Sequence, residues 1–367
     1  MARYKLEDIF DLQMGKTPSR NNSEYWNTCD NKWISIGDLT QAGKYITDTK
    51  EYLSDVAVEE SGIKIIPANT VVMSFKLSIG KTAITSEDMY SNEAIMAFHD
   101  KHVVDLMSEY IYYMFKYKDW DEGTNKAVMG KTLNKATLSK VEIEVCPLEK
   151  QKEIVELLDK VSTVLDGRNE ELKKLDELIK ARFVEMFGDI KTNNMNWDKV
   201  QMKNVVDIRG RVGWKGYKKE DLRENGPLVL GATHLTDSGD LDLSAPVFLS
   251  REKYEESPEI VLQRNDLIFT QRGNTIGKVG LVEHDIGEAT INPCVLILRP
   301  QNINPIYLKR YFVMEETKDD MWLLNSGSAQ PMITQKGIGE YYMMLPPKEL
   351  QDSFADFVNQ VDKSKVA

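Results

Sequence analysis

The tetrapeptide Ile79-Gly80-Lys81-Thr82, within the segment MSFKLSIGKTA of residues 73–83, has residue types that bind nucleotide phosphates. A phosphate-binding loop also needs a glycine five positions before the glycine of this Gly-Lys pair, so that its backbone can fold around the phosphates. Phe75 occupies that position, and its bulky ring stands where the loop needs no side chain. The motif is therefore incomplete at its most demanding position, and a nucleotide hydrolase is kept only as an alternative.

Two other groups of residues have types that could do chemistry. Asn292-Pro293-Cys294-Val295 is close to an adenine-methyltransferase motif, but it lacks the aromatic residue that stacks on a flipped base. His99 and His102 lack a third metal ligand nearby, which favours a solvated turn. The three cysteines are isolated from one another and are expected to be reduced thiols. We expect no catalytic constellation, no cofactor and no metal, with a self-sufficient methyltransferase as the alternative.

The composition is that of an ordinary globular protein with an acidic balance. At 367 residues and 42.0 kDa, the length allows two domains or three small ones. The formal charge of −11 means that a nucleic-acid-binding protein of this composition must concentrate its Lys and Arg locally. There is no long apolar run and no signal peptide, so we expect a cytoplasmic protein.

The sequence contains an internal repeat with an offset of 196 to 200 residues. Ile65–Ser74 falls opposite Val261–Thr270, and each reads as an Asn turn that leads into an apolar strand. Ser78–Ala83 falls opposite Thr275–Gly280, where Val279 stands in place of the Ser or Thr that a phosphate loop requires. The Ile-Gly-Lys segment therefore serves a purpose that both halves share and that is not Mg-nucleotide binding.

A long helix follows the first copy of the repeat. Apolar residues spaced alternately by four and three, from Ile154 to Met186, predict a coiled-coil seam on a helix spanning Lys150–Phe187. Asp166-Gly167 interrupts the seam, and Gly188 is expected to cap the helix. At about 1.5 Å per residue the helix is ~55 Å long, which suits a spacer between two globular bodies. The alternative is a helix packed into the core of one domain.

The order of these segments resembles the specificity subunit of type I restriction-modification systems over essentially the whole chain. The segments that carry the resemblance are LEDIFDLQMGKTPSR, KWISIGDLT, NTVVMSFKLSIGKTAI, NEA, PLEKQKEIVELLDKV and ARFVEMFGD in the first half, and NDLIFTQRGNTIGKVGLV, INPC and LPPKELQDSFADFVNQVDKSK in the second. Each segment is a weak signal by itself. Their order, which occurs twice and is followed by a long helix, is a strong one.

The resemblance implies an α+β fold with two pseudo-repeated, strand-rich target-recognition domains joined by long antiparallel coiled-coil helices. The expected divisions are residues 1–147 for the first domain, 148–188 for the central helix, 189–345 for the second domain and 346–367 for a truncated second helix. The family reads a bipartite site in double-stranded DNA. Partner methyltransferase subunits, two in number, methylate adenine, restriction subunits can join them, and the specificity subunit is not catalytic. A coiled-coil scaffold with two protein-binding domains is a further alternative.

The repeat also separates two kinds of candidate DNA contact. Domains that read different half-sites must differ where they contact bases, whereas phosphate contacts can be the same in both. Lys81 and Lys278 are the shared candidates for phosphate binding, with an ordinary exposed charge as the alternative. Gly80 and Gly277, which precede them, are expected to permit a positive φ or a close backbone approach.

Polar loop residues that differ between the copies are the candidates for base contacts. Those of the first domain are Lys16, Thr17, Ser19, Arg20, Asp38, Lys76, Ser78, Lys126 and Lys131. Those of the second are Arg209, Arg211, Trp214, Lys215, Tyr217, Lys218, Thr233, His234, Gln271, Arg272, Asn274, Ser328 and Gln330. Gln271-Arg272-Gly273-Asn274 is the richest group, since Arg pairs with guanine and Gln or Asn with adenine.

The carboxyl end gives one more expectation. Aligned at an offset of 200, Ala367 falls opposite Gly167, so the second helix stops where the first reaches its midpoint. The seam from Leu172 to Met186 then lacks a partner within the chain and would expose several apolar side chains. We expect another chain to cover it, either a helix of a methyltransferase subunit or a second copy of this protein.

Overall fold

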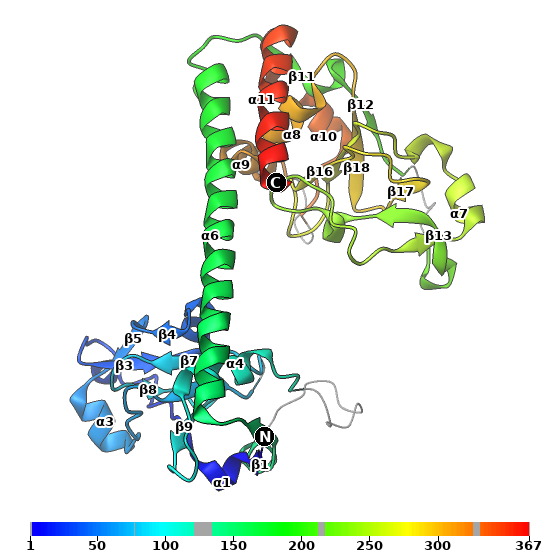
Figure 1. Ribbon diagram of the computed structural model, residues 1–367. Helices are drawn as coiled ribbons and strands as arrows, with labels where there is room; N and C mark the ends of the chain where they lie inside the picture. The colour runs from blue at the N-terminus through cyan, green and yellow to red at the C-terminus, as the bar shows by residue number, and fades with distance from the viewer. Residues whose placement is uncertain (1, 77, 121–133, 212–216, 326–330, 367) are drawn as a thin grey trace. The chain divides into compact units, whose positions relative to one another are not determined.

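The computed structural model of the chain describes all residues except 1, 77, 121–133, 212–216, 326–330 and 367 (Figure 1). It has two compact units, Met1–Gly167 and Arg168–Ala367, which divide within the long helix α6 (Leu148–Phe187). Both units mix helices and strands, as the α+β prediction requires. The finer division at residues 147, 188 and 345 stays a prediction.

The described residues of the first unit form three sheets. The largest has the order β2-β9-β6-β7-β4 and consists of β2 (Phe10–Met14), β9 (Ile95–Asp100), β6 (Val71–Ser74), β7 (Thr82–Thr85) and β4 (Tyr45–Ile46). The others are β5-β3-β8 (Glu51–Leu53, Asn31–Ile34, Tyr90–Ser91) and the pair β1-β10 (Ala2–Lys5, Glu142–Val145). The helices are α1 (Leu6–Ile9), η1 (Ser23–Tyr25), α2 (Ile36–Gln41), α3 (Asp55–Ser61), α4 (Ser108–Tyr117), α5 (Lys135–Leu138) and the first half of α6.

The second unit repeats this arrangement. The sheets are β12-β18-β15-β16 (Val206–Arg209, Val295–Pro300, Leu267–Thr270, Val279–Leu281), β14-β13-β17 (Phe248–Leu249, Leu222–Leu230, Ala289–Ile291) and β11-β19 (Lys199–Gln201, Tyr342–Met344). The helices are η2 (Met202–Asn204), η3 (Lys219–Asp221), η4 (Ala232–His234), α7 (Arg251–Glu255), η5 (Pro258–Ile260), α8 (Pro305–Val313), α9 (Glu315–Leu323), α10 (Gln335–Glu340) and α11 (Lys348–Val366). The repeat seen in the sequence is thus a repeat of topology.

The central strand of each large sheet is buried on both faces. In β15, Leu267 and Phe269 belong to the core that contains α8 and α11, whereas Ile268 belongs to a second core on the opposite face. In β6, Val71 and Val72 divide in the same way between two cores. Alternate residues of a strand point to opposite faces, so these continuous apolar runs mark strands covered on both sides.

In each unit, a buried glutamine in the first turn of a long helix joins that helix to the rest of the unit through hydrogen bonds. Gln151 is buried in α6, accepts from the Met107 N–H and donates to the Cys146 carbonyl. Gln351 is buried in α11, accepts from the Asn304 N–H and donates to the Pro346 carbonyl. Each amide therefore satisfies backbone groups that burial would otherwise leave without partners.

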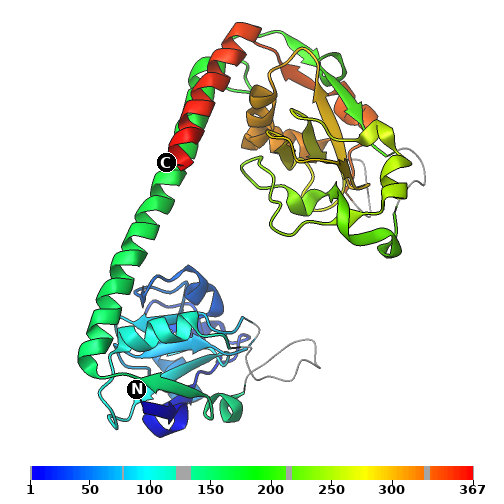
Figure 2. The same cartoon turned by 45° about the vertical axis from the view of Figure 1, so that its right-hand side comes forward.

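The expectation that Leu172–Met186 lacks a partner within the chain is wrong. Helix α11 runs antiparallel to the second half of α6 (Figures 1 and 2), so that Arg168 donates to the Lys365 carbonyl at 2.9 Å, while the rings of Phe187 and Phe354 lie 5.3 Å apart. Leu175 and Ile179 pack in the same core. Because the partner runs in the opposite direction, its end meets the middle of α6 and its start meets the end of α6.

Gly188 ends α6 as expected, since its φ of 78° belongs to the left-handed region that favours glycine. The exposed part of the predicted seam lies in the first half of the helix, where Val161 and Leu165 face solvent. No helix among the described residues combines the length and the apolar content that crossing a membrane requires.

The packing of α11 predicts the effect of a pair of matched substitutions. Phe354→Ala removes a fully buried ring and should lower the free energy of unfolding of the second unit by about 3–5 kcal/mol. It should also speed amide hydrogen exchange in α11 and in residues 168–187. Phe357→Ala, three residues on at a half-buried position, should cause a smaller loss. Equal losses from the two variants, with exchange of residues 168–187 unchanged, would contradict the packing described here.

Candidate DNA interface

The Ile-Gly-Lys segments form the turns of two equivalent hairpins, β6–β7 and β15–β16. Gly80 has a φ of 89° and Gly277 a φ of 85°, both in the region that other residues rarely adopt. A Cβ atom on Gly80 would lie 3.0 Å from Trp120 Cδ1, and one on Gly277 would lie 3.1 Å from Met321 Cβ. Both glycines thus combine a positive φ with a close approach, which confirms the expectation.

The hairpin position also explains why the segment is not a phosphate loop. A phosphate loop ends at the amino terminus of a helix, whose N–H groups and dipole face the anion. Here Thr82 opens strand β7 and Val279 opens strand β16. The Gly-Lys pair lies in a turn between antiparallel strands in both units.

The Asn-Pro-Cys segment is a turn that occurs in both units. The Asn292 side chain accepts from the Cys294 N–H at 2.8 Å, and Val295 then opens β18. In the first unit the Asn92 side chain accepts from the Ala94 N–H at 2.9 Å, immediately before β9. An asparagine whose side chain accepts from the backbone N–H two residues further on forms an Asx turn. The Asn-Pro-Cys segment is therefore a turn before a strand, which agrees with its lack of the aromatic residue of a methyltransferase motif.

Three loops meet at one end of the large sheet in each unit. In the first unit, the Lys16 N–H donates to Ser91 O at 2.8 Å and the Phe75 N–H to Ala94 O at 3.0 Å. In the second, Arg211 Nε donates to Ile291 O at 3.0 Å, and the Gln271 N–H to Cys294 O at 3.0 Å. We call these segments the three-loop cluster: residues 15–20, 75–76, 78–81 and 91–94 in the first unit, and 209–211, 271–278 and 291–294 in the second.

The first loop of the first unit is held by acidic residues. Thr17 donates to Glu93, and Arg20 forms two bonds to the Glu51 carboxylate while its guanidinium lies 3.8 Å from the ring centre of Trp26. The hydrogen bonds with Glu51 raise the pKa of Arg20. Arg20 therefore has a carboxylate partner that a base edge would have to replace. Of the other two candidates in this loop, Lys16 donates its side chain to Ser61 O, and Ser19 is exposed.

Lys76, Ser78 and Lys81 lie on the β6–β7 turn. Lys76 Nζ lies 5.3 Å from the ring centre of Phe75, and the Ser78 N–H donates to Lys76 O at 2.7 Å. Ser74 Oγ donates to Ser78 O and accepts from the Lys81 N–H at 3.1 Å, which fixes the turn. Lys81 Nζ donates to Thr40 Oγ1. The three candidates therefore lie on the same turn between β6 and β7.

Two candidate arginines of the second unit, Arg209 and Arg211, lie at the end of β12 and just after it. Arg209 forms a 2.7 Å ion pair with Asp207. Arg211 is half-buried beside the ring of Tyr217, and burial lowers the pKa of Arg211 and raises that of Tyr217. Lys218 follows and pairs with Glu220 at 3.5 Å.

Gln271, Arg272 and Asn274 lie on the β15–β16 turn. Gln271 Nε2 donates to Pro293 O at 3.0 Å, and an Arg272 guanidinium nitrogen lies 3.2 Å from the Met332 sulfur. Asn274 is exposed. Lys278, at the end of the turn, forms a 3.0 Å ion pair with Asp237. The group that the sequence marks as richest in base-reading types therefore shares its turn with the phosphate candidate.

Asp38 and His234 have a structural task that the sequence prediction did not include. The Asp38 carboxylate accepts from the Ser35 N–H at 2.8 Å, and His234 Nδ1 accepts from the Gly231 N–H at 3.1 Å. These are equivalent positions in the two units, and both side chains are buried. Each caps a short helix, so we leave both out of the proposed base contacts and retain Thr233, which is exposed next to His234.

Six candidates lie outside the described residues: Lys126, Lys131, Trp214, Lys215, Ser328 and Gln330. The sequence prediction also missed acids that hold predicted contact residues, among them Glu51 and Asp237. In the repeat Asp237 falls opposite Gln41, the residue after Thr40, so aligning the two copies carries no signal for its contact with Lys278. Within the described parts of the chain, no three His, Cys, Asp or Glu side chains gather as they would around a metal ion.

Comparison with known proteins agrees with this twofold organisation. The chain matches the type I restriction modification DNA specificity domain twice, over residues 1–176 and 194–367. It is 23% identical over 377 residues to the type I restriction enzyme MjaIX specificity subunit of Methanocaldococcus jannaschii, covering 96% of this chain and 85% of that protein. It is 24% identical over 310 residues to the MjaVIII specificity subunit of the same organism, covering 78% of this chain and 69% of that one.

A solved structure shows the same fold. The type I restriction-modification system S subunit from M. genitalium superposes with a TM-score of 0.53 at 14% identity, covering 99% of this chain and 90% of that chain. The family match includes both strand-rich units and both copies of the three-loop cluster. On these grounds the chain belongs to the type I restriction-modification DNA specificity family.

Proposed function

We propose that this chain is the DNA-reading subunit of a type I restriction-modification enzyme, and that each unit reads one half of a bipartite target in double-stranded DNA. The observation that carries the proposal is the three-loop cluster, which occurs once in each unit on the same scaffold. Its lysine-bearing turn is the same in both copies, whereas the side chains around that turn differ. Shared phosphate contacts and different base contacts are what two readers of different half-sites require.

In this proposal Lys81 and Lys278 contact phosphate, and the surrounding polar side chains contact base edges. Two positive-φ glycines fix the position of these lysines relative to their sheets. Gln271, Arg272 and Asn274 are the strongest candidates for base contacts in the second unit, and Lys76 and Ser78 lie on the matching turn of the first. The acidic partners of Arg20 and Arg209 hold those side chains until a base or a phosphate replaces them.

We propose that the chemistry belongs to partner subunits. The two segments that resembled catalytic motifs are a hairpin turn and an Asx turn, and both occur in each unit. Methyltransferase subunits, two per chain, would methylate an adenine in each half-site, and restriction subunits would join them in the cytoplasm. Binding of S-adenosylmethionine or ATP by the purified chain alone would instead favour a self-sufficient enzyme.

The exposed seam on the first half of α6 is the proposed docking site for a methyltransferase helix. The seam residues Val161 and Leu165 are exposed there, and so are Leu157 and Val164 beside the seam. Val161 is 47% exposed, whereas its repeat equivalent Val361 is 7% exposed, because α6 covers α11 in the second unit. A row of apolar side chains at this spacing is typical of a helix-binding face.

The first prediction from the proposed function is that the two units read their half-sites independently. Replacing residues 198–345 with the corresponding segment of another family member should change one half of the methylated motif and leave the other intact, because each unit has its own sheets and its own cluster. The motif is read by methylation-sensitive sequencing of a host that carries the chimaera. A simultaneous change in both halves would show that the units do not read independently.

The second prediction separates phosphate contacts from base contacts. Lys81→Ala or Lys278→Ala should weaken binding to every DNA sequence alike and flatten the slope of log affinity against log salt by about 1. Gln271→Ala or Arg272→Ala should cost about 1–3 kcal/mol on the cognate site and little on other sequences. Lys152→Ala, which removes an α6 lysine, serves as the control for charge alone. A wild-type salt slope in both lysine variants would remove the phosphate assignment.

The third prediction tests the docking site. Val161→Asp places a charge in the exposed seam and should weaken assembly with the methyltransferase subunit at least tenfold, without unfolding the chain, because the position is already in contact with solvent. Glu156→Gln, at an exposed position outside the seam, is the matched control. Undiminished assembly of the Val161 variant, measured by analytical ultracentrifugation, would place the docking site elsewhere.

A further inference from the structure

The two proposed phosphate lysines have chemically different partners, which come from the matching segments 36–41 and 232–237 of the two units. Lys81 Nζ donates to the neutral hydroxyl of Thr40, whose own hydroxyl donates to Ile36 O at 2.7 Å. Lys278 Nζ lies 3.0 Å from a carboxylate oxygen of Asp237. A charged acid thus lies beside one lysine and an uncharged hydroxyl beside the other.

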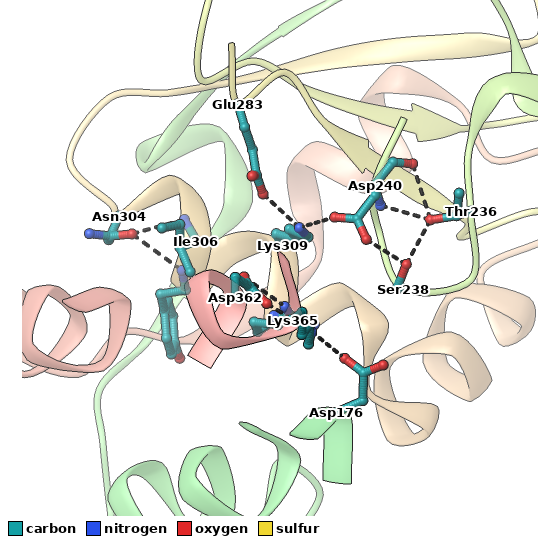
Figure 3. A network of polar contacts seen from close by, with 12 residues as sticks. Asp176, Thr236, Ser238, Asp240, Glu283, Asn304, Ile306, Lys309, Asp362 and Lys365 are labelled. Carbon is teal, nitrogen blue, oxygen red and sulfur yellow. Dashed lines mark hydrogen bonds and ion pairs between the residues drawn. The ribbon is translucent and has the colours of Figure 1, made fainter. Parts of the chain in front are cut away.

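The turn that carries Asp237 is fixed by a network of polar contacts (Figure 3). Thr236 Oγ1 accepts from the Asp240 N–H at 2.9 Å and lies 2.8 Å from Ser238 Oγ, which donates to the Asp240 carboxylate at 2.6 Å. The Thr236 N–H closes the turn by donating to Asp240 O at 3.0 Å. Asp237 therefore lies in a turn, residues 236–240, that is held by these hydrogen bonds.

Lys309 anchors this turn to the body of the second unit. It is 2% exposed in α8 and contacts Asp240 on one side and Glu283, just after β16, on the other (Figure 3). Burial raises the pKa of the Asp240 carboxyl, but the charge of Lys309 and the hydrogen bonds from Lys309 and Ser238 together outweigh burial and hold this pKa below its ordinary value. The ionised network thus joins the turn to the helix and to the end of the hairpin that carries Lys278.

The accessibility of the ion pair suits exchange with a DNA phosphate. The Asp237 side chain is 93% exposed, whereas that of Lys278 is 26% exposed. An exposed ion pair is weak and is screened by salt, so a phosphate can displace its carboxylate. The fixed turn nevertheless keeps that carboxylate close to the incoming phosphate, where like charges repel.

From this arrangement, and building on the proposed phosphate contact of Lys278, we propose that Asp237 competes with DNA phosphate for Lys278. The second unit then binds the DNA backbone less tightly than the first, and its occupancy of a site depends more on base contacts. Non-specific binding, which depends on phosphate contacts, is lowered by the same competition. Asp237 is thus a specificity-determining residue that need not touch a base.

The sequence provides a substitution that tests this inference. Asp237→Thr replaces the carboxylate with a neutral hydroxyl, the kind of group that Lys81 contacts in the first unit, and should raise the affinity for cognate and unrelated DNA alike. Because Lys278 then neutralises a phosphate without competition, the slope of log affinity against log salt should steepen by about 1. The gain in affinity over the wild-type chain should therefore shrink by about threefold between 50 and 200 mM salt. Thr40→Asp should have the opposite effect through Lys81.

A double-mutant cycle separates competition for Lys278 from general repulsion. Asp237→Thr is measured with Lys278 present and in the Lys278→Ala background, on the full chain with cognate and unrelated duplexes. If Asp237 acts through Lys278, most of the gain should vanish in the Lys278→Ala background. An equal gain in both backgrounds would show that Asp237 only repels DNA and would overturn the inference. The cycle does not depend on the Thr40 variant, which removes a hydrogen bond in α2.

The same measurements distinguish this inference from the function on which it rests. Lower affinity in Lys278→Ala, together with no gain in Asp237→Thr, would refute the competition and leave the phosphate contact in place. Wild-type affinity and salt slope in Lys278→Ala would refute the phosphate contact and the competition together.

Discussion

The second unit depends on one cluster of aromatic rings that joins three helices. Phe183 and Phe187 of α6 lie 5.6 and 5.3 Å from Phe354 of α11, and Phe183 stacks on Tyr307 of α8 at 5.7 Å. Because these rings are buried together, the helix pair cannot move without α8. Helix α8 in turn packs on the sheet, where Phe312 lies 5.6 Å from Phe269 of β15. The hairpin that carries Gln271 and Lys278 is therefore positioned by the helices through direct packing.

Charged side chains complete this link near the carboxyl end of α11. Lys365 pairs with Asp176 of α6 at 2.7 Å and with Asp362 at 2.8 Å (Figure 3). Burial lowers the pKa of Lys365, but the hydrogen bonds with the two carboxylates outweigh burial and raise it. Arg310 of α8 lies 3.6 Å from Asp362. The antiparallel register of α6 and α11 is thus set by aromatic packing at one end and by ion pairs at the other.

The repeat could be predicted from the sequence because its strongest constraints are backbone constraints. Gly80 and Gly277 are required by a positive φ, and the asparagines at 92 and 292 by an Asx turn, so these residues recur in both copies. The pairing of the helices was harder to predict. Aligning two copies compares each helix with its equivalent, but it does not reveal that the two helices run antiparallel in contact.

The identity of the individual contact residues was the least predictable part. Polar residues in loops either face solvent or bond to the local backbone, and sequence alone does not separate these tasks. Asp38 and His234 are of the second kind, because both cap short helices from buried positions. Arg20 shows another limit, since the carboxylate of Glu51 that holds it lies on a strand 31 residues further along the chain.

In the proposed function, one chain reads two separate half-sites and directs their methylation. The most direct test is to sequence modified bases genome-wide in a host that carries this chain with its methyltransferase subunits and in a matched host without the chain. We expect a methylated motif of two short sequences separated by a non-specific spacer, with a methyladenine in each. This motif should be absent from the host without the chain. A continuous motif, or methylation that persists without the chain, would contradict the proposed function.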